Sequence, residues 1–286
     1  ADEARAMFDT SLEECGIDYF DYYLLHNLGG ARTAKFDEYD MWNYVAKAKA
    51  DGLVRHVGFS MHDGPETLEE ILTAHPEVDF VQLQVNYLDW DDPVTQSARC
   101  MEVAAAHGVP VIIMEPVRGG KLASLSEEDV AKLTAQRPDE TPVAWAFRFI
   151  QGIPEVCVTL SGMSNFEQLK ENIATFEEER PLTVEDRAVL AKIVADMLGQ
   201  GTVPCTACRY CTSHCPQGLD IPDLLSLYNQ RQITGNGDFI SRMRLQTMDA
   251  DKRPSACIGC GSCAAVCPQQ IDIPGVLAKF AAEAEA

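Results

Sequence analysis

The last third of the chain repeats one cysteine spacing, and this repeat restricts the fold more than any other feature of the 286 residues. The stretch CTACRYCTSHCP begins at Cys205, and CIGCGSCAAVCP begins at Cys257. Both follow the pattern C-x2-C-x2-C-x3-C-P, and the likeness continues beyond it, where CPQGLDIPDLL parallels CPQQIDIPGVL. Two copies in register are not a chance occurrence.

The spacing is the one with which bacterial ferredoxins hold 4Fe–4S clusters. Three thiolates at i, i+3 and i+6 can surround one cubane, whereas the fourth cysteine is fixed by proline and ligates the other cluster. We therefore predict two clusters with crossed ligands. One cluster takes Cys205, Cys208, Cys211 and Cys267, and the other takes Cys257, Cys260, Cys263 and Cys215.

Two other uses of these cysteines are weaker. Zinc prefers pairs of C-x2-C, often with histidine, and His214 could enter such a site. Disulfides would suit a small secreted domain instead. The remaining cysteines, Cys15, Cys100 and Cys157, occur in apolar or helical stretches, so we expect small buried side chains there.

The 41 residues between Cys215 and Cys257 exceed the gap of a compact ferredoxin. They predict two helices, over IPDLLSLYNQRQ and DFISRMRLQTM, separated by TGNG. Pro222 and Pro274 suit the first turn of a helix. The arrangement resembles the α-helical ferredoxin domains of multi-subunit respiratory enzymes, in which helices hold two clusters.

The net charge of −21 arises in the first 200 residues, which hold 16 Lys+Arg and 36 Asp+Glu, against 7 and 8 in residues 201–286. So acidic a surface argues against a nucleic-acid partner, whose phosphates need Lys and Arg. No apolar run approaches the ~18–20 residues of a membrane span. We therefore expect neither nucleic acid nor a membrane span.

The first 200 residues alternate between short apolar runs and amphipathic segments, which is typical of parallel βα units. We expect strands at 19–26, 54–60, 78–87, 109–117 and 155–162. We expect helices at 38–52, 64–75, 92–108, 141–152, 164–179 and 183–198, the first of them ending at Gly52. Five βα units are fewer than the eight of a closed (β/α)8 barrel.

The order of these segments resembles an aldo-keto reductase. DYFDYYLLHN resembles the fourth barrel strand of that family, GLVRHVGFSMH the fifth and VQLQVNY the sixth. VPVIIMEPVRGGKL resembles the seventh strand, and VTLSGMSNFEQLKEN the eighth with the segment that wraps the dinucleotide. These five segments and the cysteine repeat together make the chain similar to the aldo-keto reductases fused to a 4Fe–4S dicluster domain.

The resemblance implies an α/β fold, a partial (β/α)8 TIM barrel of about five βα units followed by a small α-helical 4Fe–4S dicluster domain. The expected domains are the barrel at 1–180, a connecting helix at 181–200 and the ferredoxin-type domain at 201–286. The family's first three strands, with its catalytic Asp, proton-donating Tyr and Lys, have no counterpart here. At about 30 residues per βα unit, we expect an incomplete copy of a longer protein, with an open sheet and no activity as a fragment.

The resemblance also implies site residues. His26 corresponds to the active-site histidine that helps to orient the substrate carbonyl. Gln82 would hold the nicotinamide carboxamide, with Ser60 beside it. Met61 stands where asparagine is common, and Met114 where many members place an aromatic residue, so the nicotinamide site is looser than usual.

Two later segments would bind the phosphates and the adenine. The start of a helix offers free N–H groups to anions. The expected cofactor-binding positions are Glu115, Pro116, Arg118, Gly119, Ser161, Gly162, Met163, Ser164, Gln168, Glu171 and Asn172. Many members have Lys and Arg where this chain has Gly162 and Gln168, so NADP and NAD both stay open, with Lys170 a substitute cation.

These features predict an NAD(P)-dependent oxidoreductase of the cytoplasm that reduces a carbonyl, or oxidises an alcohol in reverse, with two 4Fe–4S clusters that exchange electrons with a redox protein partner. A flavin fingerprint, G-x-G-x-x-G after a strand, is not present. Two alternatives stay open. The chain could be an electron-transfer module on a non-catalytic barrel remnant, or a reductase whose clusters are structural or sense oxygen.

Overall fold

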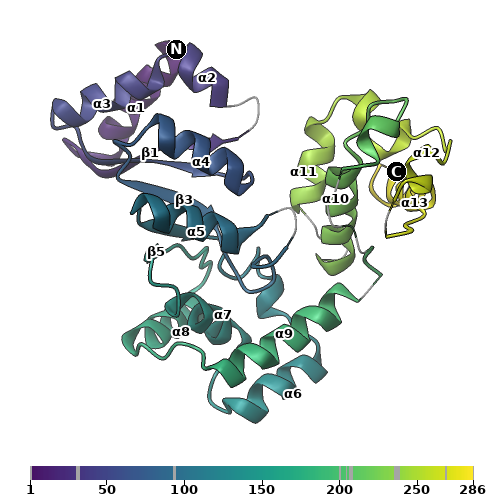
Figure 1. Ribbon diagram of the computed structural model, residues 1–286. Coiled ribbons are helices and arrows are strands. Elements are labelled where there is room, and N and C mark those ends of the chain that lie inside the picture. Colours follow the sequence, from purple (N-terminus) through teal and green to yellow (C-terminus); the bar gives the residue numbers. More distant parts are fainter. Residues whose placement is uncertain are drawn as a thin grey trace. The chain divides into compact units, whose positions relative to one another are not determined.

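The computed structural model describes residues 2–29, 33–92, 95–199, 201–203, 205, 209–234, 239–267 and 269–285. The chain forms two compact units, Ala1–Arg187 and Ala188–Ala286. The first unit is α/β and the second is helical (Figure 1). No described helix is both long and apolar enough to cross a membrane.

One parallel sheet forms the centre of the first unit, with its strands in chain order. The strands are β1 (Phe20–Leu28), β2 (Val54–Met61), β3 (Phe80–Gln84), β4 (Val111–Met114) and β5 (Val156–Thr159). The middle strands are largely buried, because helices and side chains cover both of their faces. Phe80, Val81, Val111 and Ile113 are accordingly at most 2% exposed. Parallel pairing brings all five carboxyl ends to one edge of the sheet.

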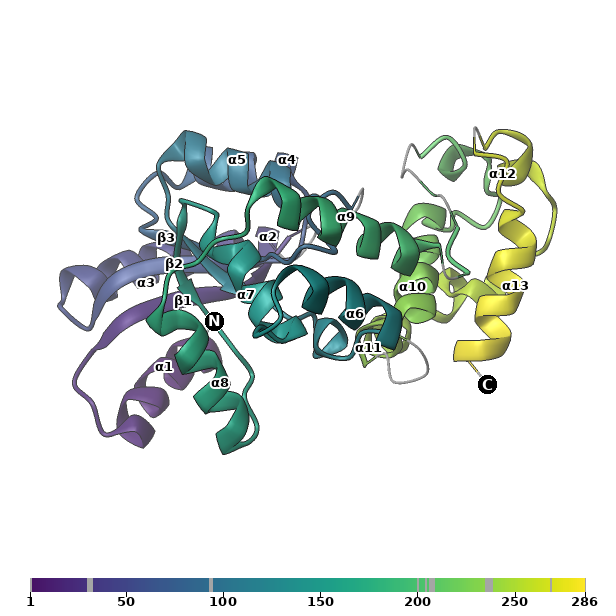
Figure 2. The ribbon, with the colours of Figure 1, turned by 90° about the horizontal axis from the view of Figure 1, so that it is seen from below.

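Helices return the chain from the end of each strand to the start of the next. The helical segments of this unit are α1 (Asp2–Cys15), α2 (Thr33–Glu38), α3 (Met41–Ala50), α4 (Pro65–Ala74), α5 (Ser97–His107), the 3-10 turn η2 (Lys121–Ala123), α6 (Glu127–Gln136), α7 (Pro142–Gln151), α8 (Phe166–Glu177) and α9 (Val184–Leu198). Of these, α1 precedes β1, and α8 and α9 follow β5. The helices that follow β2 and β3, α4 and α5, lie side by side in both ribbon views (Figures 1 and 2). The boundary between the two units falls within α9.

The expected helix at 38–52 is present as α3, but it begins three residues later than expected. Asp40 adopts a left-handed backbone with φ 57°, so α2 ends at Glu38 and α3 begins at Met41. A short polar side chain tolerates this conformation, and Asp40 Oδ1 accepts a hydrogen bond from Asn43 Nδ2 at 2.6 Å. The local bond offers an alternative to a continuous helix.

The expectation that the three scattered cysteines are buried is correct for Cys100 alone. Cys15 ends the peripheral helix α1 and is exposed. Cys157 is exposed because it belongs to β5, at the edge of the sheet. Apolar sequence context does not reveal that a strand lies at an edge.

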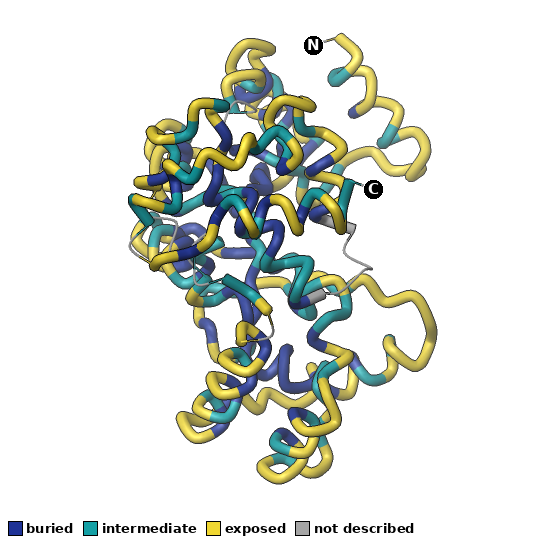
Figure 3. Tube along the Cα trace, turned by 90° about the vertical axis from the view of Figure 1, so that its right-hand side faces the viewer, coloured by how far each residue is buried: buried dark blue, intermediate teal, exposed yellow. Residues whose placement is uncertain are grey.

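The prediction of an open, five-stranded part of a barrel is confirmed. β1 and β5 form the two edges of the sheet, and no strand of the described residues pairs with their outer sides. Tyr22 on β1 is 56% exposed and Val158 on β5 is 41% exposed. Buried residues run through the interior in Figure 3, whereas α1, which begins at the N label, is mostly exposed apart from Phe8.

The second unit is built from short helices around an apolar core. Its elements are η3 (Thr212–His214), α10 (Ile221–Thr234), α11 (Phe239–Thr247), η5 (Ala250–Lys252), η6 (Pro254–Ala256), α12 (Ser262–Ala265) and α13 (Ile273–Ala284). The two helices expected on either side of TGNG are confirmed as α10 and α11, and residues 235–237 of that linker lie outside the described residues. Leu224 and Leu225 of α10 meet Ile273 and Leu277 of α13 in the core.

Candidate functional site

Four cysteines, one from the first repeat and three from the second, line a single cavity of the second unit. They are Cys215, Cys257, Cys260 and Cys263. Apolar side chains close the rest of the cavity, among them Leu219, Ile221, Pro274 and Leu277. The structure thus brings Cys215 to three cysteines that follow it by more than 40 residues, which is the crossed grouping expected from the spacing.

Glycines allow the chain to wrap this cavity closely. Gly259 and Gly261 have φ 71° and 76°, a left-handed conformation that suits glycine because it has no Cβ. Gly261 also starts α12, the helix that carries Cys263. The turn therefore directs Cys257, Cys260 and Cys263 toward one space.

The chemistry of the donors fits an iron–sulfur cluster. No three His, Cys, Asp or Glu side chains of the described residues converge as closely as one metal ion requires. The four thiols instead surround a space, which suits a cubane because its irons occupy separate corners. Hydrogen bonds from the backbone N–H and the hydroxyl of Ser262 lower the pKa of Cys260 and favour the thiolate that ligates metal. Burial raises the pKa of Cys263, and the neighbouring Cys257 and Cys215 raise it further.

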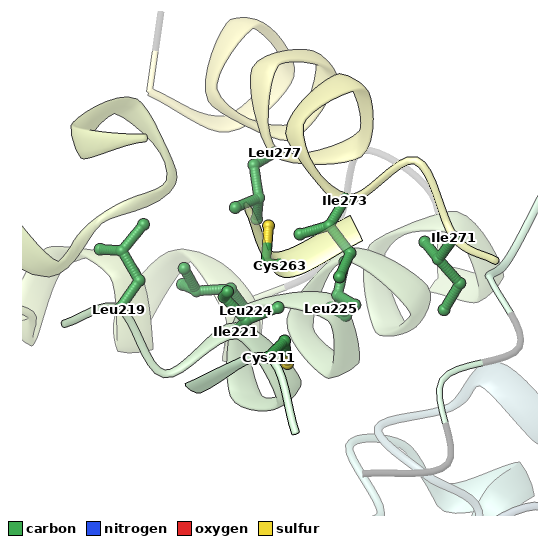
Figure 4. Packing of buried hydrophobic residues seen from close by; sticks show 9 residues of the cluster. All are labelled: Cys211, Leu219, Ile221, Leu224, Leu225, Cys263, Ile271, Ile273 and Leu277. Carbon is green, nitrogen blue, oxygen red and sulfur yellow. The ribbon is translucent and has the colours of Figure 1, made fainter. Parts of the chain in front are cut away.

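The second expected ligand set is only partly described. Cys211 is 8% exposed, whereas Cys205 and Cys267 are half-buried, and all three pack against the same apolar core. Figure 4 shows Cys211 and Cys263 among the leucines and isoleucines of α10 and α13. Cys208 lies outside the described residues. None of the ten described cysteines is in a disulfide.

In the first unit, the expected nicotinamide-side residues lie near the carboxyl ends of adjacent strands. His26 is exposed near the end of β1, and the N–H of the next residue, Asn27, donates to Ser60 Oγ on β2 at 2.7 Å. Ser60 is in register with Gln82 of β3, whose Nε2 lies 3.5 Å from the sulfur of Met114 on β4. The structure therefore brings four strand ends together at the edge where ligands of parallel sheets bind.

The loop after β4 holds the next group of expected residues. Glu115, Arg118 and Gly119 all have left-handed backbones, with φ between 49° and 60°. Pro116 between them is buried. The Arg118 side chain is 9% exposed, and its Nε donates to Asp89 Oδ1 at 2.9 Å, where Asp89 is 2% exposed. The guanidinium expected to bind phosphate is thus held by a buried carboxylate.

Spacing along the sequence did not identify the partners of Arg118. Gln84 Nε2 and Asn86 Nδ2 donate to Asp89 Oδ2 at 2.7 and 2.8 Å. Asn86 Nδ2 also donates to the carbonyl of Glu115 at 3.1 Å, which ties the end of β3 to the loop after β4. The sequence did contain a signal for this network, because the stretch NYLDWDD places amide and carboxyl side chains directly after a strand.

The last group surrounds the start of α8. Gly162, Met163 and Ser164 are exposed, and Ser161 is half-buried. Asn172 Nδ2 donates to Ser161 Oγ at 2.9 Å, and Ser164 N–H donates to Gln168 Oε1 at 2.7 Å.

The remaining polar groups of this segment are also engaged. Glu171 bonds to the hydroxyl of Thr141. The side chain of Asn165 caps the helix by accepting from Gln168 N–H at 2.9 Å. Lys170 is 63% exposed and lies 3.8 Å from Glu167.

Comparison with known proteins agrees with this geometry. Residues 1–195 match the model of the aldo/keto reductase family. The chain belongs to the aldo/keto reductase family. Residues 204–271 match the 4Fe-4S dicluster domain, so the expected fusion of a reductase unit and an iron–sulfur domain is confirmed. An aldo-keto reductase of Mycolicibacterium vanbaalenii is 30% identical over 193 residues, which are 68% of this chain and 62% of the relative.

More distant reductases share the same region. A 9,11-endoperoxide prostaglandin H2 reductase of Trypanosoma cruzi is 24% identical over 62% of this chain and 58% of its own length. Among solved structures, the thermostable aldo-keto reductase Tm1743 has a TM-score of 0.55 at 23% identity, over 67% of this chain and 66% of its own. The aldo-keto reductase AKR11C1 of Bacillus halodurans has a TM-score of 0.52 at 23% identity, over 66% and 64%. The chain spans 60–62% of the length of the mycobacterial relatives.

Proposed function

We propose that this protein is an NAD(P)-dependent oxidoreductase that reduces a small-molecule carbonyl, or oxidises the alcohol in reverse, and that carries two 4Fe–4S clusters for electron transfer. The observation that supports the proposal best is the position of His26, Ser60 and Gln82 near the ends of three adjacent strands of an aldo/keto reductase sheet. The cysteine cavity of the same chain supports the clusters.

The chain's own residues would bind and orient. The Gln82 amide, half-buried beside Met114, can donate to and accept from a carboxamide at the end of β3. Ser60 accepts from the backbone at Asn27 and so fixes the end of β1, from which His26 can direct a ring nitrogen at a carbonyl oxygen. When bound, the nicotinamide supplies or accepts the hydride.

Proton donation needs residues other than those matched here. The family's Asp, Tyr and Lys belong to strands that precede the counterpart of β1. We therefore propose that these 286 residues bind the dinucleotide but do not by themselves complete carbonyl reduction. Turnover of NADPH with an aldehyde by this polypeptide would contradict that part of the proposal.

Two clusters with crossed ligands are the second part of the proposal. One would be held by Cys205, Cys208, Cys211 and Cys267, and the other by Cys257, Cys260, Cys263 and Cys215. When bound, each carries one electron at a time. Because exposed 4Fe–4S clusters tolerate oxygen poorly, we propose the cytoplasm as the location. A centre that carries single electrons needs a partner that does the same, and we propose a redox protein.

A second candidate function is an electron-transfer module on a barrel that no longer binds a dinucleotide. The ion pairs that Arg118 and Lys170 form favour this second function. Arg118 is held by the buried Asp89, and Lys170 lies beside Glu167, so a carboxylate accompanies each expected phosphate ligand.

Titration with NADPH and NADH, followed by the fluorescence of the bound nicotinamide, separates the two functions. We expect saturable binding that Gln82→Leu weakens about tenfold, because one or two hydrogen bonds to the carboxamide are lost. The exposed Gln136→Leu on α6 is the matched control and should leave affinity unchanged. Absence of saturable binding to the unaltered chain would favour the electron-transfer module. Iron and sulfide analysis of the same sample tests the clusters independently.

A further inference from the structure

The four cysteines of the cavity differ in their access to solvent. Cys263 is 6% exposed, Cys215 and Cys257 are half-buried, and Cys260 is exposed. Ile258, two residues before Cys260, also lines the cavity and is 62% exposed, although it is a large apolar side chain. A redox centre held by these cysteines would therefore come nearest to the surface at Cys260, beside an apolar side chain.

We propose that electrons enter and leave the second unit at Cys260, and that Ile258 is the contact for a small iron–sulfur electron-carrier protein with an apolar contact face. The proposal rests on the proposed presence of a cluster in this cavity. One electron moves from the carrier's reduced centre to the oxidised cluster, with no bond made or broken and no proton transferred. Electron transfer slows steeply with distance, so the carrier must dock where the cluster lies closest to the surface.

The surroundings of Ile258 favour an apolar contact. No Lys, Arg, Asp or Glu of the described residues lines the cavity. Its lining consists of His214, Cys215, Pro216, Gln217, Leu219, Ile221, Cys257, Ile258, Cys260, Gly261, Cys263, Pro274 and Leu277. The nearby Lys252 Nζ donates to the carbonyl of Gln217 at 3.1 Å and lies 3.7 Å from Asp251. The positive charge of Lys252 is thus balanced by the neighbouring carboxylate of Asp251.

The charge of the whole unit leads to the same partner chemistry. Residues 188–286 hold 8 Lys+Arg and 9 Asp+Glu, whereas residues 1–187 hold 15 and 35. On a chain of net charge −21, the nearly neutral second unit provides no long-range attraction for an acidic carrier, so short-range contact must hold the partner. Brief electron-transfer encounters bury little surface, and the carrier docks through a small apolar patch beside its own cluster.

Of the other ligand set, Cys208, whose place in its repeat matches that of Cys260, lies outside the described residues. Cys211 is buried, and Cys205 and Cys267 are half-buried. Among the described cysteines of the two ligand sets, an exposed cysteine with an exposed apolar neighbour therefore occurs at Cys260, beside Ile258.

Anaerobic stopped-flow mixing of the cluster-containing chain with a reduced bacterial 2[4Fe–4S] ferredoxin tests the proposal. Ile258→Gln should lower the second-order rate constant about tenfold by removing the apolar contact. Met243→Gln is the matched control, because Met243 is also an exposed apolar residue of the second unit, 45% exposed on α11, and does not line the cavity. It should react at the unaltered rate.

Two further readouts separate docking from damage to the cluster. The electron paramagnetic resonance spectrum and the rate of reduction by methyl viologen, a small molecule that needs no docking surface, should be the same in Ile258→Gln and the unaltered chain. The ferredoxin rate should not fall as ionic strength rises, because no attraction between opposite charges draws the carrier to this nearly neutral unit. Equal ferredoxin rates in Ile258→Gln and the unaltered chain would overturn the contact, and failure of the unaltered chain to react with ferredoxin would overturn the partner class. A chain that binds no iron would overturn the proposed function as well, so the two failures are distinguishable.

Discussion

Arg118 and Asp89 form a deeply buried ion pair between the loop after β4 and the segment after β3, with side chains 9% and 2% exposed. Asp89 accepts from Gln84 and Asn86 as well, so its charge is satisfied on several sides. Such a network is stable only while every member is present. Its function at the residue scale is to hold the loop after β4 against the end of β3.

Removing the carboxylate should therefore be costly. Asp89→Ala leaves the Arg118 guanidinium buried without its counter-charge, and we expect a loss of about 3–5 kcal/mol in the free energy of unfolding. Urea unfolding of the first unit, followed by circular dichroism, measures the loss. The exposed neighbour Asp91→Ala is the control and should change stability by less than about 0.5 kcal/mol. Equal effects of the two substitutions would show that the network does not support the fold.

The carboxyl of Asp186 makes the folding stability of the first unit depend on pH, and stability should fall as the pH is lowered. Burial raises the pKa of its carboxyl, but hydrogen bonds from Arg137 and Thr183 outweigh burial, and the folded-state pKa lies below the usual 3.8. A lowered pKa contributes stability that is complete above the unfolded-state value and is lost as the pH falls through the folded-state value. Asp186→Asn should be about 1–3 kcal/mol less stable near neutral pH, with the difference shrinking below about pH 4.

Denaturant unfolding across this pH range measures the effect, with the exposed Glu185→Gln as the control. A difference between Asp186→Asn and the unaltered chain that stays constant down to low pH would contradict the linkage. The half-buried Arg137 is held in place for its contact with Asp186, because it also donates to Glu140 and to two backbone carbonyls.

Sequence reasoning predicted where the candidate site residues stand along the chain, but it did not predict their contacts. His26, Ser60 and Gln82 follow from strand ends and family resemblance, and the structure brings these strand ends together. The Asp89–Arg118 pair joins positions 29 residues apart. No local pattern predicts such a pair, because it depends on how β3 and β4 lie in the sheet.

At the scale of elements, strands and long amphipathic helices were predictable because their patterns are local. The β2, α4 and α9 positions agree with the expected ranges within one or two residues. The helix predicted at 38–52 begins only at Met41, because Asp40 adopts a left-handed backbone that the local sequence pattern does not predict. The helix α6 was missed although Ser126 accepts from Asp129 N–H at its start, a capping signal that stands in the sequence.

The helix α8 presents an apolar face that is largely exposed, with Phe176 packed on one side against the ring of Phe147 on α7. Phe166, Ile173 and Phe176 are 70%, 49% and 45% exposed, and Val158 of the adjacent edge strand β5 is 41% exposed. Their spacing of three to seven residues places the three helical side chains on one side of α8. An exposed apolar patch beside an open strand edge favours association.

We expect this polypeptide to self-associate at micromolar concentration and Phe166→Ser to reduce the association. Since Phe166 is 70% exposed, the substitution should cost little stability. Sedimentation velocity measures the shift toward monomer. Val184→Ser is the control, because Val184 is 80% exposed at the start of α9 and lies off the patch. Unchanged association in Phe166→Ser would show that another surface is responsible.

At the scale of the whole molecule, the two units differ in what stabilises them. The first has a sheet with a large apolar interior, with Trp145, Phe147 and Phe59 fully buried. The second has fewer than 100 residues, and its core includes the cysteines themselves, with Cys211 and Cys263 at its centre. A bound cluster therefore contributes directly to the stability of the second unit.

Removal of iron should unfold the second unit selectively. After treatment with a chelator under mild oxidation, we expect amide hydrogens of α10 and α13 to lose protection from exchange, while those of β2, β3 and β4 keep it. Hydrogen exchange with mass spectrometry measures both regions in one sample, so the sheet is the internal control. Retained protection in α10 and α13 after complete loss of iron would show that the helical core is stable without the clusters.

The meeting of Cys215 with Cys257, Cys260 and Cys263 also bears on the order in which iron is acquired. Closing the 41-residue segment between Cys215 and Cys257 carries an entropic cost that the first cluster to bind must meet. Once it is bound, the two repeats are already side by side, and the second cluster binds without that cost. Loading should therefore be cooperative, and native mass spectrometry during iron and sulfide addition should show chains with no cluster or with two, and few with one.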